Sequence, residues 1–315
     1  ILRDVRGQVA GIVEERDATG EQRRIQEINA GLMAGQAGRL AGWLSRVGAD
    51  NAQGEYYLTD VVALAVADGV PVTAVCAPVA DEVLGINDRV QLAEAERLHR
   101  QRVARSVMEQ GVTLFDPQRF DLRGELHCGR DVSIDINVIV EGRVELGDEV
   151  KIGPNVVIRD SVIAAGTRVH ANSVIDGAQI GANCEIGPFA RLRPASVLAE
   201  RAKVGNFVEV KKSEIGPRSK VNHLSYIGDA TIGADVNVGA GTITCNYDGA
   251  NKHRTVIGDG AFIGSGVELV APVEIGAGAT IGAGSTIGKA APPGELTLER
   301  ARQVTVKGWK RPQKG

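Results

Sequence analysis

The sequence predicts a mainly β chain whose larger part is a parallel β-helix, and three observations lead to this prediction. An aliphatic residue followed by glycine recurs every six residues, with a few slips, between Cys128 and Gly288. The fifth position of each unit is also small or aliphatic. In addition, 40 of the 315 residues are glycine, well above the average share of about 7%. Such a hexapeptide repeat is typical of a parallel β-helix.

The repeat has a simple physical interpretation. Each unit is one short strand plus a corner, and three units make one turn of a triangular prism. The aliphatic residue of a pair such as Ile152-Gly153 points inward and stacks on its counterpart in the next coil. We expect the glycine to allow corner conformations that a side chain would penalise.

Residues 1–86 do not follow the repeat. Their apolar patterns predict a strand over 8–14, helices over 38–47 and 59–67, and a second strand over 72–77. Alternating strands and helices favour an α/β layer with a partly parallel sheet. This segment is expected to be part of a larger domain.

One long helix is predicted over residues 86–110, which contain no Gly or Pro and are rich in Ala, Leu, Glu and Arg. Asn87 or Asp88 can cap its start, and Gly111 ends it. We expect this helix to serve as a connecting arm.

These patterns predict three segments. They are residues 1–86 as a partial α/β domain, 87–121 as a helical linker, and 122–315 as a β-helix domain with a C-terminal tail. The repeat fails after Pro292 and Pro293, and the basic tail 306–315 is expected to be loosely ordered. Because the chain starts at Ile1 without a Met, we expect an upstream portion.

The departures from the repeat indicate where the surface differs from a plain solenoid. Five-residue units begin at Ile158, Ile175, Val210 and Ile227 and shorten a corner. Residues 244–256 interrupt the register and are expected to protrude. They form either a tolerated surface loop or a functional loop, since they concentrate Asn, Tyr, Asp, Lys, His and Arg.

Composition limits the function classes. A net charge of −3 and a pI near 6.0 give no general attraction to nucleic acid or anionic membranes. No apolar run approaches the roughly 20 residues that span a membrane. The four cysteines have no CxxC or CxxH spacing, which favours a reducing, cytoplasmic setting without a zinc site.

Polar residues on the repeat are candidates for chemistry. Arg193 and Lys211 are 18 residues apart and therefore neighbours on adjacent coils, about 4.8 Å apart. Two stacked cations repel each other unless an anion lies between them, which predicts a phosphate. His223, close to Tyr226 and Asn237, can accept a proton near neutral pH, as an amine attacking an acyl group requires.

Two alternatives remain for the histidine. It could be an exposed corner residue without a role. It could also belong to a metal site of the kind that trimeric β-helix carbonic anhydrases use, which would need three ligands from His127, His170, His223 and His253.

Long motifs carry a resemblance to a known family. The runs IGPFARLRP (186–194), VGNFVEVKKSEIG (204–216) and NHLSYIGDATIGADVNVGAGTITCNYDGANKHRTVIGD (222–259) resemble the bacterial bifunctional N-acetylglucosamine-1-phosphate uridyltransferases/glucosamine-1-phosphate acetyltransferases. Upstream, GIVEERDAT, QEINAG, NAQGEYYLTD and GINDRVQLAEAE continue the similarity. The resemblance therefore covers nearly the whole chain.

The resemblance implies a Rossmann-like uridyltransferase domain, a helical arm and a left-handed β-helix that forms homotrimers. The β-helix would acetylate glucosamine 1-phosphate from acetyl-CoA. The first domain would couple the product to UTP with Mg²⁺, giving UDP-N-acetylglucosamine for peptidoglycan and lipopolysaccharide. Small molecules are the only other implied partners.

Carried over by motif, His223 is the general base. The sugar phosphate would be held by Arg193, Lys211, Tyr226, Asn237 and Lys252. The acetyl-CoA side would comprise Ala240, Asn246, Tyr247, Ser265, Ala283 and Arg300. Upstream, Glu14, Asn29 and Asn87 match residues that contact UDP-N-acetylglucosamine, and Asn87 also matches a magnesium ligand.

The chain departs from the family pattern in its first part. The glycine-rich nucleotide loop, and the aspartate that shares the metal with Asn87, would lie before Ile1. An asparagine alone is a poor Mg²⁺ site, because that ion prefers carboxylates and phosphate oxygens. The uridyltransferase half is therefore expected to be incomplete in this chain.

The expected mechanism is direct transfer, in which His223 takes a proton from the amine while the N–H of Ala240 stabilises the oxyanion. Cys245 is not expected to form an acyl-enzyme. Two other functions remain open: a trimerisation module without activity, and a hexapeptide acyltransferase for another amino sugar. The intact NHLSY and CNYDGANK segments argue against the latter.

Overall fold

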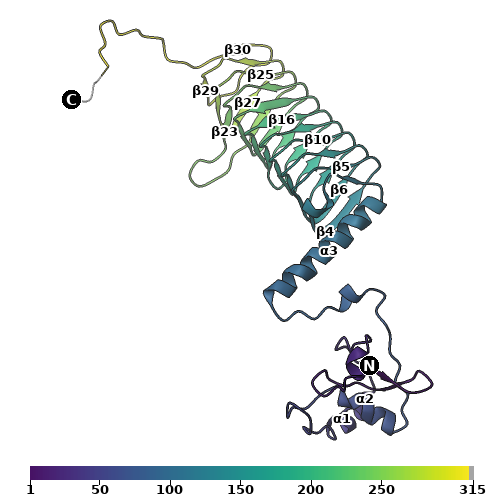
Figure 1. The fold of residues 1–315 in the computed structure, drawn as a ribbon. Helices are drawn as coiled ribbons and strands as arrows, with labels where there is room; N and C mark the ends of the chain where they lie inside the picture. Colours follow the sequence, from purple (N-terminus) through teal and green to yellow (C-terminus); the bar gives the residue numbers. More distant parts are fainter. Residues whose placement is uncertain (312–315) are drawn as a thin grey trace. The chain divides into compact units, whose positions relative to one another are not determined.

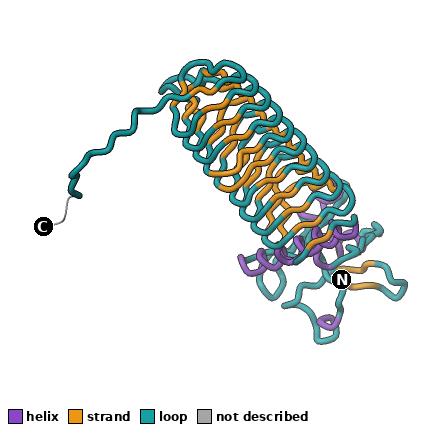
Figure 2. The backbone as a smooth tube through the Cα atoms, turned by 90° about the horizontal axis from the view of Figure 1, so that it is seen from above, coloured by secondary structure: helices purple, strands orange, loops and turns teal. Residues whose placement is uncertain are grey.

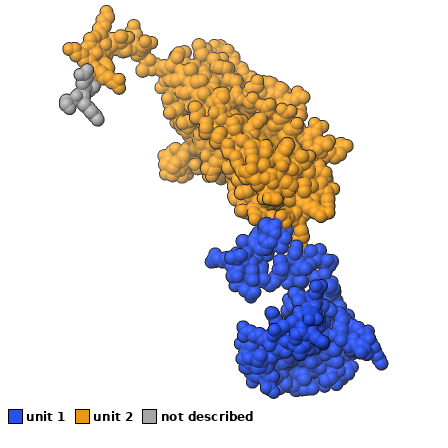
Figure 3. Space-filling view, in the orientation of Figure 1, with its two compact units in different colours: residues 1–98 blue, residues 99–315 orange. Residues whose placement is uncertain are grey.

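A computed structural model describes residues 1–311, and the contacts within the chain divide it into two compact units, Ile1–Leu98 and His99–Gly315 (Figure 3). The described residues contain three α-helices: α1 (Ala37–Leu44), α2 (Asp60–Ala67) and α3 (Arg89–Glu109). Short 3₁₀ helices are η1 (Gln22–Arg24), η2 (Ala80–Val83) and η3 (Pro117–Arg119). Strands are the main regular secondary structure of the second unit, which confirms the predicted mainly β class.

The first unit is a small α/β layer. Strand β1 (Leu2–Arg3) pairs antiparallel with β2 (Val9–Gly11), and α2 packs on β2. The shared core is formed by Val9, Val61, Val62 and Ala65, all of which are buried. The predicted strand around β2 and both predicted helices are therefore present.

Two expectations for this unit are wrong. Residues 72–77 form no strand, and the sheet is antiparallel instead of partly parallel. Val75 is 92% exposed, because no neighbouring strand pairs with this segment, and an unpaired extended segment gains no ladder hydrogen bonds. The antiparallel pairing follows from the tight turn between β1 and β2, since a short connection can join only antiparallel strands.

Helix α3 forms close to its predicted bounds. Asp88 caps its start by accepting a hydrogen bond from the Gln91 amide at 2.8 Å, which selects one of the two predicted caps. Its C-terminal end lies in the second unit, where Ala104 and Val107 join the hydrophobic core of the β-helix. Gly111, at φ 96°, then ends the helix.

The second unit is a parallel β-helix, whose strands stack in columns with loops at the corners (Figures 1 and 2). Its strands form three ladders. The first ladder contains β3 (Thr113–Leu114), β5 (Ser133–Ile134), β7 (Lys151–Ile152), β10 (Arg168–Val169), β13 (Glu185–Ile186), β16 (Lys203–Asn206), β19 (Lys220–His223), β22 (Asn237–Val238), β25 (Phe262–Ile263), β28 (Thr280–Ile281) and β30 (Leu296–Thr297).

The other two ladders start from two long strands, β4 (Phe120–Cys128) and β6 (Val138–Leu146). The second ladder continues with β8 (Val157–Arg159), β11 (Val174–Asp176), β14 (Arg191–Leu192), β17 (Glu209–Lys211), β20 (Tyr226–Gly228), β23 (Ile243–Cys245), β26 (Glu268–Val270) and β29 (Thr286–Ile287). The third continues with β9 (Val162–Ile163), β12 (Gln179–Ile180), β15 (Val197–Leu198), β18 (Glu214–Ile215), β21 (Ala230–Ile232), β24 (Thr255–Ile257) and β27 (Val273–Ile275).

The core is the predicted stack of aliphatic side chains. On the second ladder, Leu192, Val210, Ile227 and Leu269 occupy the inward position of their coils and are 0% exposed. Burying one such side chain contributes roughly 1.5–3 kcal/mol. The repeat therefore holds each coil in register with its neighbours.

The glycines of the aliphatic-glycine pairs have a different role from the one expected. Gly239 does not need a left-handed backbone; instead, a Cβ there would lie 2.6 Å from the carbonyl carbon of Gly264 in the next coil. The left-handed corner conformation is adopted by other residues, among them Asn137, Asn155 and Asn172, with φ between 58° and 60°. The pair glycine thus permits close stacking of coils.

The interruption of the repeat is shorter than predicted. Thr244 and Cys245 belong to β23, while Thr255 and Val256 belong to β24, so the protruding loop is residues 246–254. The repeat pattern was lost at Thr244 because a hydroxyl-bearing side chain takes an inward position there, at 0% exposure. The loop projects from the solenoid beside β23 (Figure 1).

The repeat also continues beyond the two prolines. Strand β30 pairs with β28, so one further strand of the first ladder follows Pro293, contrary to the expected end. The last part of the predicted basic tail, residues 312–315, lies outside the described residues. None of the helices within residues 1–311 is both long and apolar enough to cross a membrane.

Candidate functional site

His223 lies at a corner where the first ladder passes into the second. Four further residues occupy the equivalent position on other coils, as the backbone hydrogen bonds show. The residue that follows each of these positions donates its N–H to the carbonyl oxygen at the same position one coil earlier, at 2.7–3.3 Å. We call this set the His223 column. Its members are Asn206, His223, Ala240, Ser265 and Ala283.

Asn206 orients the imidazole of His223. Its side-chain Oδ1 lies 2.6 Å from the Nδ1 of His223, and a carbonyl oxygen can only accept a hydrogen bond. The proton of the neutral ring is therefore on Nδ1, and Nε2 carries the free lone pair. The ring is solvent-exposed, so that lone pair is accessible from solvent.

Ala240 offers a hydrogen-bond donor one coil beyond His223. Its carbonyl accepts from the Gly266 amide at 2.7 Å, but its own N–H has no partner within residues 1–311. Further along the column, Arg300 passes Gly284, where a Cβ would be 3.9 Å from the Cδ of the arginine. The column therefore brings an imidazole and a free amide N–H onto adjacent coils, and a guanidinium lies beside its last member.

A row of charged side chains runs along the second ladder. Arg123, Glu141, Arg159 and Asp176 occupy matching positions of successive coils and alternate in sign. Glu141 pairs with Arg123 at 3.1 Å and also with Arg159, and Arg159 reaches Asp176 at 3.5 Å. The alternation keeps this part of the row neutral.

The alternation breaks at Arg193 and Lys211, which follow one another in the same row. Arg193 donates to Glu209 at 2.8 Å, and this hydrogen bond holds the pKa of the guanidinium above its usual value. The side chain of Lys211 has no hydrogen-bond or ion-pair partner in the part of the chain that the structure describes. A carboxylate thus already neutralises part of the expected charge repulsion, and one unpaired cation remains.

Tyr226 lies between this cation pair and the protruding loop. Its hydroxyl accepts a hydrogen bond from the Nδ2 of Asn246 at 3.4 Å, and the same Nδ2 donates to Asp229 at 2.5 Å. Asn246 is only 5% exposed, which fixes its amide. Residues predicted for the two substrates, Tyr226 and Asn246, are therefore in direct contact.

The protruding loop is held closed by its own contacts. Asp248 accepts from the amides of Ala250 at 2.8 Å and Asn251 at 2.6 Å, and lies 2.6 Å from the Nε2 of His253. These contacts hold the pKa of Asp248 well below its usual range, and the hydrogen bond from the Asn251 amide has the largest effect. Near the tip, the Lys252 ammonium lies 5.0 Å from the ring centroid of Tyr247.

One residue predicted to bind the sugar phosphate, Asn237, does not contact the others within residues 1–311. Asn237 begins β22 on the first ladder, in register with Lys220 and Phe262, and no contact joins it to Arg193 or Lys211 in the described residues. It precedes Ala240 in the same coil, so it belongs to the side of the His223 column.

Burial disfavours the thiolate form of two cysteines of the β-helix, Cys245 and Cys184. Burial raises the pKa of Cys245, and it raises that of Cys184 to about 11. A thiolate is the nucleophilic form, so both side chains are protonated at neutral pH. This agrees with the expectation that Cys245 forms no acyl-enzyme.

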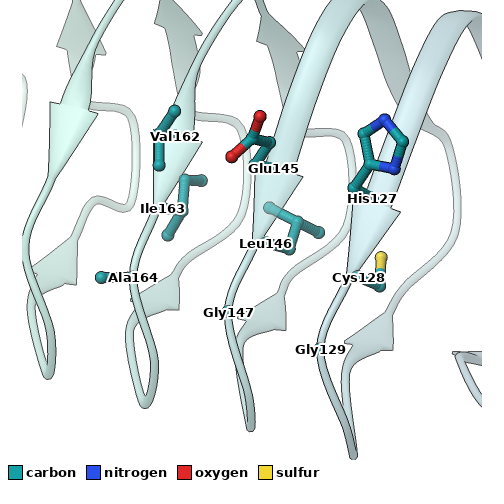
Figure 4. A pocket seen from close by; sticks show the side chains of 9 residues that line it. All are labelled: His127, Cys128, Gly129, Glu145, Leu146, Gly147, Val162, Ile163 and Ala164. Carbon is teal, nitrogen blue, oxygen red and sulfur yellow. The ribbon is translucent and has the colours of Figure 1, made fainter.

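A shallow hollow of about 300 Å³ lies elsewhere on the β-helix (Figure 4). His127 and Glu145 occupy matching positions on adjacent strands at its edge. Its lining residues are His127, Cys128, Gly129, Glu145, Leu146, Gly147, Val162, Ile163 and Ala164. None of the residues predicted for the two substrates or for catalysis belongs to it, and His127 is one of the four histidines of the alternative metal site.

In the first unit the predicted residues are apart. Glu14 accepts from the Thr59 hydroxyl at 2.8 Å, and Asn29 accepts from the Gly31 amide at 3.1 Å. Asn87 would bring one amide oxygen to Mg²⁺, while the neighbouring Asp88 is engaged as the helix cap. These residues do not form a donor set that fits Mg²⁺.

The alternative metal site would need three ligand side chains close to one another. Among residues 1–311, no group of three His, Cys, Asp or Glu side chains lies close enough together to hold a metal ion. His253, one of the four histidines considered, is paired with Asp248 instead.

Three residues of this site were not predicted from the sequence: Asn206, Glu209 and Asp229. The repeat itself contained the signal for two of them. Asn206 precedes His223 by one coil, and Glu209 is the outward neighbour of Tyr226 and Arg191 on adjacent coils. Asp229 could not be found this way, because its partner Asn246 lies in the loop outside the repeat.

An exposed apolar stack adjoins His223. Phe189, Phe207 and Leu224 follow one another at one corner position, with φ of 55°, 56° and 50° and exposures of 48%, 55% and 63%. The two phenyl rings stack at 5.2 Å between centroids. Bulky side chains at positive φ are uncommon and strained.

Comparison with known proteins places this chain among transferases. A family model described as bacterial transferase hexapeptide (six repeats) matches residues 254–289, and one described as GMPPB C-terminal domain matches residues 122–224. The chain is 63% identical over 315 residues to the bifunctional protein GlmU of Methylococcus capsulatus, covering 100% of this chain and 68% of the relative.

A second curated relative and one solved structure also match. The bifunctional protein GlmU of Alkalilimnicola ehrlichii is 63% identical over 314 residues, covering 99% of this chain and 67% of that protein. Among solved structures, a UDP-N-acetylglucosamine acyltransferase from Bacteroides fragilis has a TM-score of 0.45 at 19% identity, covering 56% of this chain and 69% of its own.

Proposed function

The chain belongs to the family of the bifunctional protein GlmU, and we propose that it transfers the acetyl group of acetyl-CoA to the amino group of glucosamine 1-phosphate. The observation that supports this most is the His223 column, where an oriented imidazole and a free amide N–H occupy adjacent coils. A base and an oxyanion donor are the two groups that amine acylation needs.

In the proposed mechanism, Nε2 of His223 removes a proton from the amine of the sugar while its nitrogen attacks the thioester carbonyl. The N–H of Ala240 donates to the developing oxyanion, a contribution of about 3 kcal/mol for such donors. The carbon–sulfur bond then breaks, and the imidazolium returns its proton to the departing CoA sulfur. No covalent enzyme intermediate is needed.

The substrates are assigned to two neighbouring regions. Lys211 and Arg193, where the charge alternation of the second ladder breaks, are proposed to hold the phosphate together with Tyr226. Lys252 and Asn237 are proposed as further sugar-phosphate contacts. Acetyl-CoA is assigned to the column and the loop through Ala240, Asn246, Tyr247, Ser265, Ala283 and Arg300.

We further propose that the β-helix forms a homotrimer. The exposed stack of Phe189, Phe207 and Leu224 supports this, since a contiguous apolar surface on a soluble protein commonly marks an interaction site. The four cysteines are free, which supports a reducing, cytoplasmic setting.

In the first unit, Glu14, Asn29 and Asn87 are proposed to represent the UDP-N-acetylglucosamine side of a uridyltransferase domain, residues 1–86, joined by the linker 87–121 to the β-helix domain 122–315. The full-length protein would couple the acetylated product to UTP. We derive no Mg²⁺-dependent step for this chain, and we expect it to turn over no UTP.

One assay separates the proposal from its alternatives. Purified protein is given acetyl-CoA and glucosamine 1-phosphate, and free thiol is measured over time. Thiol release that depends on the sugar supports the acetyltransferase. No release would indicate a trimerisation module without activity, and stronger competition by another amino sugar phosphate would indicate a different acceptor.

A further inference from the structure

Gly228 occupies the place in the charged row directly after Arg193 and Lys211. Its φ lies outside the left-handed region, so its backbone does not require glycine. A Cβ at this position, however, would lie 2.4 Å from the Tyr226 hydroxyl oxygen and 2.7 Å from the Asn246 Nδ2. The space that a side chain would fill is thus occupied by two residues of the candidate site.

Other glycines of the β-helix differ in this respect. At Gly205 and Gly216, a Cβ would first meet the backbone oxygens of Asn222 and Gly233, at 2.0 and 2.3 Å. Those glycines are required for the stacking of coils. At Gly228 the three nearest atoms all belong to the side chains of Tyr226 and Asn246. Because no backbone atom is among them and the phenol of Tyr226 is only partly buried, a methyl group there would displace this phenol and leave the stacking of coils intact.

A buried hydroxyl holds the backbone of Gly228 in place. Thr244 Oγ1 accepts from the Gly228 amide at 2.7 Å and donates to its carbonyl at 3.0 Å. Thr244 is fully buried in a core row whose other members, such as Ile227 and Leu269, are aliphatic. A hydroxyl in this row is costly unless it is bonded. Its two shortest hydrogen bonds go to Gly228, and a longer contact of 3.4 Å reaches the Tyr226 carbonyl.

The phenol of Tyr226 is consequently held between Gly228 and Asn246. Because the carboxylate of Asp229 can only accept, the group that Asn246 directs toward it is the NH₂, and the same group donates to the Tyr226 oxygen. The tyrosine therefore keeps its own O–H free to donate. Its position next to the unpaired Lys211 suits an anionic oxygen as acceptor.

We propose that Gly228 is a positioning residue of this site. Because it has no side chain, the Tyr226 phenol can lie over it, where the phenol O–H and the Lys211 ammonium can both bind the same phosphate. This inference rests on the proposed function. The anion class is that of a sugar phosphate monoester, because the free hydroxyl donor lies over Gly228, the next place in the row after Arg193 and the unpaired Lys211.

The test compares Gly228→Ala with Gly288→Ala. Gly288 follows β29 at the corresponding place on the second ladder, also has an ordinary φ, and has no atom within 4 Å of its Cβ position. In protein with ¹³C-labelled tyrosine, the Tyr226 signal is assigned by its loss in Tyr226→Phe. We expect Gly228→Ala to move this signal and Gly288→Ala to leave it unchanged.

Kinetics provide the functional half of the test. Gly228→Ala should raise the KM for glucosamine 1-phosphate about tenfold, as expected for loss of a hydrogen bond to a charged group, with the KM for acetyl-CoA unchanged. In the Tyr226→Phe background the same substitution should add no further increase. A structural role alone would lower the melting temperature or affect both substrates.

The proposal is overturned if Gly228→Ala matches Gly288→Ala in the Tyr226 signal, or if the signal moves while the KM for the sugar phosphate stays the same. If the unmodified protein releases no thiol, the proposed function is wrong. The Tyr226 signal then still decides by itself whether Gly228 positions the phenol.

Discussion

His223 has two ring nitrogens, and Asn206 decides which of them carries the proton. The 2.6 Å contact with Nδ1 leaves Nε2 as the proton acceptor, and a base with the wrong tautomer cannot accept. The coils on either side place Asn206 and the free N–H of Ala240 at the same corner, because the solenoid repeats its corner positions at one strand spacing. Residue identity, and not local backbone shape, therefore determines the chemistry.

Removing the Asn206 side chain tests this role. Asn206→Ala leaves the imidazole free to rotate and to change tautomer, so kcat should fall at least about tenfold, within the roughly 10²–10⁴ that a general base contributes. The KM values should change little, since Asn206 is not proposed to touch either substrate. A kcat within twofold of the unmodified protein would show that His223 needs no orienting partner.

Lys211 is the unpaired cation of the charged row. Lys211→Ala should raise the KM for glucosamine 1-phosphate by about 10- to 100-fold, because a hydrogen bond to a charged group is worth about 1.5–3 kcal/mol. The KM for acetyl-CoA should be unaffected. Lys151→Ala is the matched control, as Lys151 is an exposed lysine of an earlier coil on the first ladder; equal effects of both substitutions would argue against a phosphate site.

At the scale of elements, the protruding loop is the segment that departs from the repeat. Its conformation depends on Asp248, which accepts two loop amides and contacts His253. The depressed pKa of this carboxyl means that the contribution of the ionised form is fully present above its unfolded value of 3.8 and is lost as pH falls through the lower folded value. The loop is therefore expected to keep its shape at neutral and mildly acidic pH.

Asp248→Ala should open the loop without unfolding the β-helix. Hydrogen exchange of the Ala250 and Asn251 amides should become faster, because both lose their acceptor, while core amides such as that of Ile227 should not change. The KM for acetyl-CoA should rise if the loop contacts that substrate. Unchanged exchange at both loop amides would contradict the proposed role of Asp248.

Sequence patterns predicted the elements to different degrees, for physical reasons. The β-helix could be predicted because its inward aliphatic positions repeat at a fixed period. The loop bounds were missed at Thr244, where a bonded hydroxyl replaces the aliphatic residue. The strand expected over residues 72–77 failed because a strand needs a pairing partner, which an apolar run alone does not supply.

The candidate site was less predictable than its scaffold. Arg193 and Lys211 could be paired from their spacing, but Glu209, which neutralises part of their charge, was overlooked. The contact of Asn246 with Tyr226 depends on how a loop folds back across a coil, and no periodic pattern describes such a contact. The space over Gly228 likewise became visible only from the side chains that fill it.

At the scale of the whole molecule, the apolar corner beside His223 suggests that the site is completed by self-association. The corner position carries Asn in earlier coils and Gly in later ones, residues that suit a left-handed backbone. Phe189, Phe207 and Leu224 instead accept strain and exposure there. Burial against another copy of the chain would offset this cost.

Replacing both rings tests the assembly. The double variant Phe189→Asn/Phe207→Asn keeps a residue suited to the corner, so the coil should still fold. In light scattering, the mass should fall from three times 33.1 kDa toward that of one chain, and acetyl transfer should decline with it. Val162→Asn, an exposed apolar position on the third ladder, is the control; a double variant that stays trimeric would exclude this corner from the interface.

The central claim is that His223 is the base of an acetyl transfer, and steady-state kinetics of His223→Ala test it most directly. Thiol release from acetyl-CoA with glucosamine 1-phosphate should fall by about 10²–10⁴ in kcat, with both KM values nearly unchanged. His170→Ala, an exposed histidine on an earlier coil, should retain full activity. Retention of acetyl transfer within a few fold in His223→Ala would contradict the account.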